Sequence, residues 1–227
     1  MDQKKQLQIV DAAAFASAFK VSRETIERLN LYESVLRLWQ RRINLVANAT
    51  LNEVWHRHFA DSAQLAALVP PGAERLVDLG SGAGFPGLVL AILFADSTLP
   101  GNRQPVKVTL IESDTRKAAF LREVARQTGT AVDILSTRIE NPETQVKVGR
   151  ADVVSARALA PIGRLLGLAG PLFGEQTIGL FLKGKSVQAE IEAARALWAF
   201  DVTLVSSVTA EDANIAVIRR VRSSAKA

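Results

Sequence analysis

Apolar side chains in the first seventy residues recur at helical spacing. The stripe consists of Ile26, Leu29, Tyr32, Leu36, Trp39 and Ile43. A period near 3.6 residues predicts an amphipathic helix, and Ser22 is placed to cap its N-terminus. The segment Thr50–Glu53 has the form of a capping box, which predicts a second helix continuing to about Val69. Because Pro70-Pro71-Gly72 ends that helix, we expect a helical N-terminal subdomain over residues 1–70.

From Arg75 onward, short apolar runs alternate with helical patterns. Predicted strands cover residues 75–80, 106–113, 131–138 and 151–157, a segment within 170–184, and residues 201–208 and 214–222. Predicted helices cover residues 85–95, 114–129 and 186–200. This alternation predicts an α/β domain over residues 71–227, with a seven-stranded, mostly parallel sheet covered on both faces. The last two strands have no predicted helix between them, so they should form an antiparallel hairpin at one edge.

Composition narrows the class of protein. With 227 residues, of which 48% are hydrophobic and 22% charged, the chain can bury a core of its own. Its longest apolar run, Leu88–Ala95, is far shorter than the ~18 residues needed to cross a bilayer. The N-terminus lacks the order of basic, apolar and cleavage-site residues typical of a secretory signal. We therefore expect a cytoplasmic protein that does not associate with a membrane.

The contents of cysteine, histidine and charge exclude some chemistries and permit others. The chain has no cysteine, which excludes disulfides, thiolate metal sites and a cysteine nucleophile. With only His56 and His58, it lacks the residues for a histidine-based metal centre, and we predict no metal. The net charge of +5 fits an anionic partner, although a soluble basic surface accounts for it equally well. Basic residues cluster loosely at Arg41 and Arg42, at Arg122 and Arg126, and from Arg219 to Lys226.

A glycine-rich loop, VDLGSGAGFPG, occupies residues 77–87 between the first predicted strand and its helix. An open α/β sheet binds its ligand at this place, although the glycines could also serve only a tight turn. A dinucleotide-binding loop has the pattern GxGxxG, whereas Gly80, Gly82 and Gly84 are spaced as GxGxG and Phe85 stands at the third glycine position. Asp78 suits a cationic ligand and repels a pyrophosphate. The loop therefore favours S-adenosylmethionine, which has an ammonium and a sulfonium but no phosphate, over NAD.

The second strand ends in LIES, which places Glu112 at its carboxyl edge. A carboxylate there can accept hydrogen bonds from both ribose hydroxyls of an adenosine. Glu112 follows the glycines by roughly 30 residues rather than the usual ~20, and an inserted, turn-rich loop over residues 96–105 accounts for the excess. Asp114 competes for the same role, and either acid could instead be a solvated strand end.

Several motifs occur together, and in this order, in one known family. They are INLVANATLNEVWHRHFADS (residues 43–62), VDLGSGAGFPG, LIESDTRKAAFLREV, STRIEN, ADVVSARALAP and LFLKG. The chain therefore resembles the RsmG (GidB) family, bacterial methyltransferases that modify a guanine at N7 in small-subunit ribosomal RNA. The resemblance extends from about Leu36 to Val221. The glycine loop alone indicates only a class I methyltransferase, and the Arg-His-x-x-Asp-Ser and Ser-x-Arg-Ala elements narrow it to this family.

The resemblance implies a class I (Rossmann-like) methyltransferase fold, S-adenosylmethionine as the cofactor, and residues that contact it. The implied contacts are Gly80 and Phe85 in the loop, Glu112, Ser113 and Asp114 after the second strand, Ile139 and Glu140 beside the adenine, and Arg157. Asp78, Gly82 and Gly84 join this set through the pattern of the loop. The family often has Asp where Glu112 stands, which lengthens the reach of the carboxylate by one methylene. The insertion after Ala95 is atypical of the family and could shift the register there.

Arg157 carries most of the information about the methyl acceptor. Enzymes that methylate exocyclic amines have an Asn/Asp-Pro-Pro-aromatic tetrad where this chain reads Ser155-Ala-Arg157-Ala. Methylation of pyrimidine C5 requires a cysteine thiolate, and the chain has none. Guanine N7 needs neither device, because its lone pair lies in the ring plane and transfer is mainly a matter of positioning. Arg157 could bond guanine O6, the target phosphate or the cofactor carboxylate, or form a structural ion pair.

Two further groups of residues complete the candidate site. Lys183 ends the strand that follows Arg157 and is predicted to contact RNA phosphate or the target base, with assistance from Lys185, although lysines there are often only exposed. His58, Asp61 and Ser62 share one helical face, but a catalytic triad is a poor interpretation because nothing supplies an oxyanion hole. We expect His58 and Asp61 to tie the helical subdomain to the cofactor domain or to shape the RNA entrance. His56 is expected to be exposed to solvent.

These inferences combine into one predicted function. The enzyme would methylate guanine N7 in small-subunit (16S) ribosomal RNA, acting as a monomer on the RNA or on the small-subunit particle, with Arg157 and Lys183 as the catalytic residues. Three alternatives stay open at this point. They are a small-molecule methyltransferase on the same fold, a dinucleotide-binding oxidoreductase, and a non-catalytic RNA-binding assembly factor.

Overall fold

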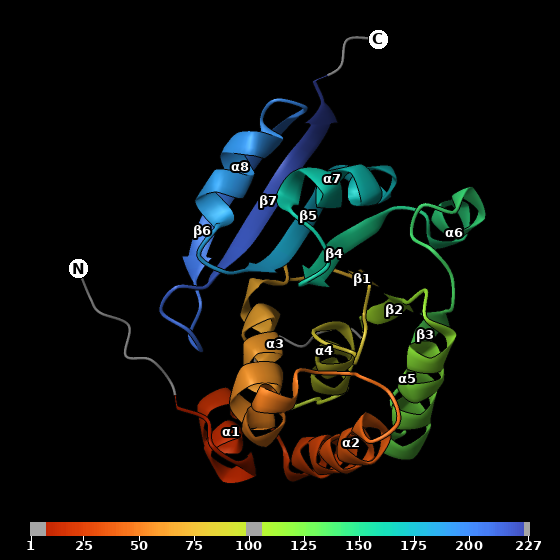
Figure 1. The fold of residues 1–227 in the computed structure, drawn as a ribbon, viewed down its shortest axis with the longest axis vertical. Coiled ribbons are helices and arrows are strands. Elements are labelled where there is room, and N and C mark those ends of the chain that lie inside the picture. The colour runs from red at the N-terminus through yellow and green to blue at the C-terminus, as the bar shows by residue number, and fades with distance from the viewer. Residues whose placement is uncertain (1–7, 99–105, 225–227) are drawn as a thin grey trace.

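A seven-stranded sheet forms the centre of the molecule in the computed structural model, which describes residues 8–98 and 106–224 (Figure 1). The strands are β1 (Arg75–Leu79), β2 (Lys107–Ile111), β3 (Asp133–Leu135), β4 (Ala151–Arg157), β5 (Phe173–Lys183), β6 (Trp198–Ser206) and β7 (Asn214–Ser223). Their order is β3-β2-β1-β4-β5-β7-β6. Strands β1 to β5 pair in parallel, and β7 pairs antiparallel with both β5 and β6. The predicted parallel sheet with a C-terminal antiparallel hairpin is confirmed.

Helices cover both faces of this sheet. The helical segments are α1 (Ala12–Phe19), α2 (Arg23–Gln40), η1 (Asn48–Glu53), η2 (Trp55–Ala60), α3 (Asp61–Ala63), η3 (Gln64–Leu68), α4 (Gly87–Phe94), α5 (Thr115–Thr128), α6 (Pro142–Val148), α7 (Ile162–Ala169), η4 (Gly170–Leu172) and α8 (Val187–Ala194). One hydrophobic core joins the N-terminal helices, α4 and α5 to one face of the sheet, and a second core joins α6, α7 and α8 to the other (Figure 1). The side chains of each strand alternate between these two cores.

The N-terminal segment agrees with the prediction in α2 but not in the second helix. Ser22 caps α2, because its side chain accepts a hydrogen bond from the backbone N–H of Thr25. The predicted capping box at Thr50 does not form, and residues 48–68 are a succession of short 3-10, π and α turns rather than one helix. The hydroxyl of Thr50 donates to the carbonyl of Ala47 and contacts Nε2 of His58, so it is not free to cap a helix.

The predicted elements differ from the structure in three places farther along the chain. Helices α6 and α7 were not predicted, although Asn141 followed by Pro142 is a helix-start signal that the structure uses. The predicted helix over residues 186–200 ends at Ala194, because Trp198 already pairs with Ser223 in the hairpin. Pairing with β7 thus takes priority over the helical pattern of this segment.

Some sequence predictions lie outside the described residues. Residues 99–105 of the inserted loop and Lys226 of the C-terminal basic cluster belong to this group. Within the described ranges, no helix has both the length and the apolar character to cross a membrane.

Candidate active site

A cavity of about 380 Å³ opens at the carboxyl ends of β1, β2 and β4. The predicted site residues that line it are Gly80, Gly82, Glu112, Ser113, Ile139, Glu140 and Arg157. Sequence reasoning missed several of its other walls, namely Lys117, Thr137, Arg138, the loop over residues 158–160, Arg164 and Leu168. Most of these carried a signal, because Lys117, Thr137, Arg138 and the loop belong to motifs quoted above, whereas Arg164 and Leu168 lie in none of them. The cavity is where an open α/β sheet with parallel strands binds its ligand.

Glu112 joins the glycine loop to the rim of this cavity. Its Oε2 accepts a hydrogen bond from the backbone N–H of Gly82 at 2.7 Å, and its Oε1 accepts one from the N–H of Asp114 at 2.7 Å. Each carboxylate oxygen has a second lone pair, so Glu112 can still accept two further hydrogen bonds. Gly80 and Gly82 both adopt positive φ, at 62° and 56°, a conformation that favours glycine. The loop can therefore present its backbone to a ligand.

Asp78 lies outside the cavity lining, inside the sheet. Its Oδ1 accepts a hydrogen bond from the hydroxyl of Ser155 at 2.7 Å, which ties β1 to β4. Burial raises the pKa of Asp78 from 3.8 to about 6, against the opposing effect of its hydrogen bonds. Gly87 at the start of α4 packs against this carboxyl group, since a Cβ there would lie 2.5 Å from the Cβ of Asp78. Asp78 therefore supports the loop from below and is not placed to touch a ligand in the cavity.

Gly84, Phe85 and Asp114 also lie outside the lining, for different reasons. Gly84 is buried, and a Cβ there would collide with the hydroxyl of Tyr32. Phe85 belongs to the loop, but its side chain is buried in the hydrophobic core. Asp114 caps α5, because its side chain accepts hydrogen bonds from the N–H groups of Arg116 and Lys117. These three residues therefore do not line the cavity but hold the segments that border it.

Aromatic residues from the N-terminal segment hold the glycine loop through Phe85. The ring of Tyr32 stacks on Phe85 with centroids 5.4 Å apart, and its hydroxyl donates to the carbonyl of Ala83 within the loop. The ring of His58 also lies parallel to Phe85, with centroids 4.9 Å apart. The guanidinium of Arg157 lies over the same ring at 4.8 Å. The N-terminal segment thus forms part of the support of the cavity.

His58 is a neutral, buried imidazole and not a base in a triad. Burial, followed by the charges of Arg157 and Arg57, lowers its pKa from 6.5 to about 3. Its Nε2 pairs with the hydroxyl of Thr50 at 2.9 Å, and its buried Nδ1 has no partner among the described residues. The hydroxyl of Ser62 donates to the backbone carbonyl of His58 at 2.6 Å rather than to the ring. The rejection of a catalytic triad is therefore supported by the geometry.

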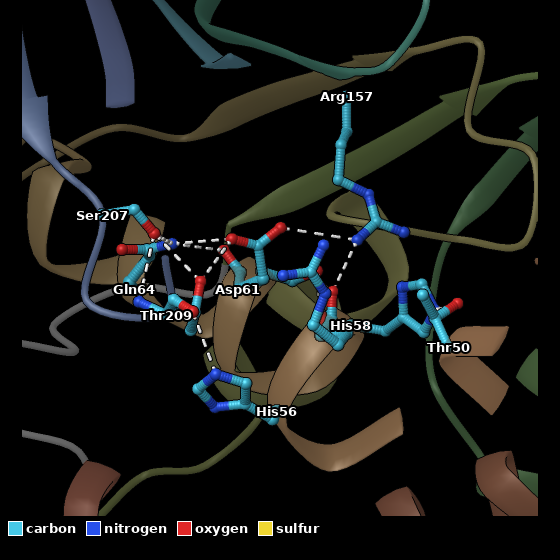
Figure 2. Close-up of polar contacts among 10 residues, drawn as sticks. Thr50, His56, His58, Asp61, Gln64, Arg157, Ser207 and Thr209 are labelled. Atoms are coloured by element: carbon cyan, nitrogen blue, oxygen red, sulfur yellow. Dashed lines mark hydrogen bonds and ion pairs between the residues drawn. The ribbon is translucent and has the colours of Figure 1, made fainter. Parts of the chain in front are cut away.

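Asp61 connects Arg157 to the loop between β6 and β7 (Figure 2). Its Oδ2 lies 3.4 Å from Nη1 of Arg157, and its Oδ1 accepts from the hydroxyl of Thr209 at 2.8 Å. Gln64 donates to the same Oδ1 and to the hydroxyl of Ser207. The two oxygens of one carboxylate therefore face two different parts of the sheet domain. This is the tie between the N-terminal segment and the sheet that the sequence suggested.

His56 belongs to the same tie, which corrects the expectation that it is exposed to solvent. It is partly buried, with Nδ1 accepting a hydrogen bond from the backbone N–H of Ile9 at 3.4 Å. Its Nε2 lies 2.9 Å from the carbonyl of Thr209 (Figure 2). A contact across 153 positions of sequence gave no local signal that could have revealed it.

Arg157 combines an ion pair with open hydrogen-bonding capacity. Its Nη1 donates to the carbonyl of Arg57 at 3.0 Å and faces Asp61. Burial lowers its pKa, but a guanidinium stays protonated at any physiological pH. Among the described residues, Nε and Nη2 have no acceptor, and the side chain lines the cavity. The structural ion pair and a ligand contact, which the sequence left as alternatives, are thus compatible in one side chain.

Lys183 does not line the cavity. Its Nζ donates to the carbonyl of Ala160 at 2.6 Å and lies 2.8 Å from Oε2 of Glu190. Only 9% of its side chain is exposed, whereas Lys185 is exposed to solvent. The described part of the chain holds no group of three or more His, Cys, Asp or Glu side chains that could bind a metal ion.

Comparison with known proteins agrees with this geometry. The family described as rRNA small subunit methyltransferase G matches residues 25–219. Ribosomal RNA small subunit methyltransferase G of Parvibaculum lavamentivorans is 50% identical over 212 residues, which cover 93% of this chain and 90% of that protein. The protein of the same name in Rhodospirillum centenum is 53% identical over 191 residues, covering 84% and 82%.

Solved structures show the same fold at low sequence identity. A methyltransferase from Geobacter sulfurreducens aligns with a TM-score of 0.56 and 14% identity, covering 94% of this chain and 98% of that one. A TehB-like SAM-dependent methyltransferase from Corynebacterium glutamicum aligns with a TM-score of 0.54 and 13% identity, covering 85% and 99%. The predicted class I methyltransferase fold is confirmed. The chain therefore belongs to the rRNA small subunit methyltransferase G family, and it is an adenosylmethionine-dependent methyltransferase.

Proposed function

We propose that this enzyme transfers a methyl group from S-adenosylmethionine to N7 of a guanine in small-subunit (16S) ribosomal RNA. The observation that carries the proposal is the cavity in which Glu112, the glycine loop and Arg157 meet at the carboxyl ends of β1, β2 and β4. The names of the relatives point to the same class of RNA. We further propose that residues 71–227 form the cofactor-binding unit and that residues 1–70 complete it through Tyr32 and His58.

The residues of the cavity fit the cofactor. The free lone pairs of Glu112 suit the two ribose hydroxyls, and the buried side chain of Ile139 offers an apolar surface for the adenine. Gly80 and Gly82 allow the backbone to approach the ligand closely. Ser113 and Glu140 complete the rim, and Asp78, Gly84, Phe85 and Asp114 act by holding these residues in place. When bound, the cofactor supplies a methyl group on a positively charged sulfur that departs as a thioether.

The acceptor side needs positioning rather than acid–base chemistry. Guanine N7 already has a lone pair in the ring plane, so no residue has to remove a proton before transfer. Consistent with this, His58 is neutral, and its buried ring is packed against Phe85. The free N–H groups of Arg157 are the donors suited to an oxygen acceptor, which is guanine O6, a phosphate or the cofactor carboxylate. An Arg157→Lys variant separates these roles: a higher Kd for the cofactor indicates the carboxylate, and a higher KM for RNA indicates the base or phosphate.

The proposed partner is the RNA itself or the small ribosomal subunit particle, met in the cytoplasm by a monomeric enzyme. The excess of basic side chains behind the net charge of +5 would contact RNA phosphates, so the affinity for RNA should fall as the salt concentration rises. A stacked guanine must also leave its neighbours to reach the methyl group, so folded RNA or the particle should be a better substrate than a short oligonucleotide.

Methyl transfer to unmodified small-subunit RNA and particles tests the proposal directly. With labelled S-adenosylmethionine, the label should appear in 7-methylguanosine on nucleoside analysis. Label in methylated adenosine or cytidine alone, or no label at all, would contradict the proposed target. Calorimetry with S-adenosylmethionine and with NADH separates the methyltransferase from an oxidoreductase. RNA binding without any transfer would instead favour an assembly factor.

A further inference from the structure

A partly buried ion pair lies directly behind one wall of the cavity. Nζ of Lys183, at the end of β5, is 2.8 Å from Oε2 of Glu190 on α8. Only 9% of the Lys183 side chain and 19% of the Glu190 side chain are exposed. The remaining oxygen of Glu190 accepts from the hydroxyl of Ser186 at 2.8 Å. Both charges are therefore paired and hydrogen-bonded within the protein.

The same two side chains bond the loop that joins β4 to α7. Lys183 donates to the carbonyl of Ala160 at 2.6 Å, and Glu190 accepts from the backbone N–H of Ile162 at 3.1 Å. The ammonium of Lys183 and the carboxylate of Glu190 thus bond the loop on either side of Pro161. These two hydrogen bonds fix the position of the loop relative to the sheet and the position at which α7 begins.

This loop is a wall of the cavity. Ala158, Leu159 and Ala160 all line it, and the side chain of Leu159 lies against Gly80 of the glycine loop. A Cβ placed on Gly80 would come within 2.6 Å of Cδ1 of Leu159. Ala158 has a φ of 51°, a left-handed conformation that alanine disfavours and that persists only where the surroundings impose it. The loop therefore depends on external bonds for the shape it gives to the cavity.

We propose that Lys183 and Glu190 are positioning residues that hold the loop over residues 158–161 as a wall of the cofactor cavity, and that Lys183 acts on cofactor binding rather than on RNA. This inference rests on the proposed function. Moving the ammonium of Lys183 onto an RNA phosphate would leave the carboxylate of Glu190 partly buried without its partner, which is unfavourable. The predicted contact between Lys183 and RNA is thereby replaced by a contact with the protein's own backbone.

Two single variants and one matched control test the proposal. Lys183→Met and Glu190→Gln should each raise the Kd for S-adenosylmethionine by about five- to tenfold, because each removes a charged hydrogen-bond partner of the loop. Glu192→Gln, an exposed glutamate on the same helix, should leave this Kd unchanged. RNA affinity and its dependence on salt, measured by fluorescence anisotropy with small-subunit RNA, should not change in any of the three.

Glu190→Gln separates the proposal from a direct RNA contact. If Lys183 reached for phosphate, releasing it from Glu190 would tighten RNA binding and steepen its salt dependence. An unchanged cofactor Kd in Lys183→Met, together with a salt slope reduced by about one, would overturn the proposal. Lys183→Arg, which keeps a cationic donor, should recover part of the cofactor affinity.

The double variant Lys183→Met/Glu190→Met distinguishes positioning from stability. Removing both charges should restore the urea midpoint toward that of the wild type, because no unpaired charge is left behind, while the weak cofactor binding persists. If the urea midpoint and the cofactor affinity recovered together, the single variants would have weakened binding only through lost stability, which would contradict the proposal. A wild-type protein that fails to bind S-adenosylmethionine would refute the proposed function itself, whereas equal binding by wild type and variants would refute only this inference.

Discussion

The imidazole of His58 lies parallel to the ring of Phe85, with centroids 4.9 Å apart and an angle of 16° between the planes. Phe85 belongs to the glycine loop, whereas His58 comes from the π-turn that follows the first helices. Tyr32 stacks on the same phenyl ring. Through these contacts, a segment that is separate along the chain sets the position of the loop that borders the cofactor cavity.

Phe85→Ala should therefore lower both stability and cofactor affinity. Removing a buried phenyl group costs about 3 kcal/mol in free energy of unfolding, and here it also releases the loop. Phe200, buried in the core on the other face of the sheet, provides the control. Phe200→Ala should destabilise by a similar amount in urea denaturation yet bind S-adenosylmethionine normally under native conditions. Equal losses of affinity in the two variants would show that Phe85 has no specific role in the loop.

Gly80→Ala should weaken cofactor binding by more than about tenfold, roughly 1.4 kcal/mol. The new methyl group would push Leu159 into the cavity, and the backbone would be strained at a φ of 62°. Gly129, which caps the C-terminus of α5, has a similar φ of 64° but open space around it. Gly129→Ala should therefore cost about 1 kcal/mol of stability and leave calorimetric binding unchanged. Normal binding by Gly80→Ala would mean that the loop does not approach the ligand.

Asp61→Asn should reduce kcat/KM for methyl transfer by about tenfold, since it removes the negative charge facing Arg157. The amide oxygen can still accept from Thr209, so the tie to the β6–β7 loop survives. Thr209→Val breaks the bond to Oδ1 and the hydroxyl contact with Ser207 but leaves the negative charge that faces Arg157, so it should change kcat/KM much less. A double-mutant cycle with Arg157→Lys checks the assignment: if Asp61 acts through Arg157, the two effects will not add. Additive effects would contradict it.

Asp78→Asn should raise stability at neutral pH relative to the wild type. The pKa of Asp78 rises from 3.8 to about 6 on folding, chiefly through burial. The folded state therefore keeps this proton more tightly, and the stability that it contributes is full below pH 4 and lost as pH rises through 6. The free energy of unfolding of the variant minus that of the wild type should increase by up to about 3 kcal/mol between pH 4 and pH 7. Urea denaturation across this range measures the difference, and a flat difference would refute the assignment.

His58→Gln should have the opposite pH signature. The pKa of His58 falls from 6.5 to about 3, foremost through burial, so its contribution to stability is full above pH 6.5 and is lost as pH falls. Between pH 4 and pH 6, this loss and the gain from Asp78 have opposite slopes and largely cancel in the wild type. His58→Gln should therefore become relatively more stable as the pH falls from 7 to 4 in the same urea measurements. A difference independent of pH would show that His58 is not held neutral.

Local patterns along the chain determined the order and type of most elements. The alternation of apolar runs and helical stripes was enough for the seven strands, the C-terminal hairpin and the position of the glycine loop. These features depend on side chains that are neighbours in sequence, and the carboxyl ends of parallel strands meet at one edge wherever they occur. For the same reason, Glu112 could be assigned to the ligand-binding edge of the sheet from its position alone, whereas Ser113, Ile139 and Arg157 were assigned as cofactor contacts through the resemblance to the family.

Only the tertiary structure decided what the polar side chains bind. The partners of Lys183 in the structure are Ala160 and Glu190, neither of which the sequence predicted. His56 was predicted to face solvent and instead joins Ile9 to Thr209. The predicted capping box at Thr50 also does not form, because the hydroxyl of Thr50 pairs with His58 instead. A polar group pairs with whatever donor or acceptor the fold brings within hydrogen-bonding distance, even across 148 positions between Asp61 and Thr209. Hydrophobic periodicity carries no information about distances between residues far apart in the sequence. The helices and strands therefore follow from the sequence pattern, whereas the hydrogen-bond partners follow from the fold.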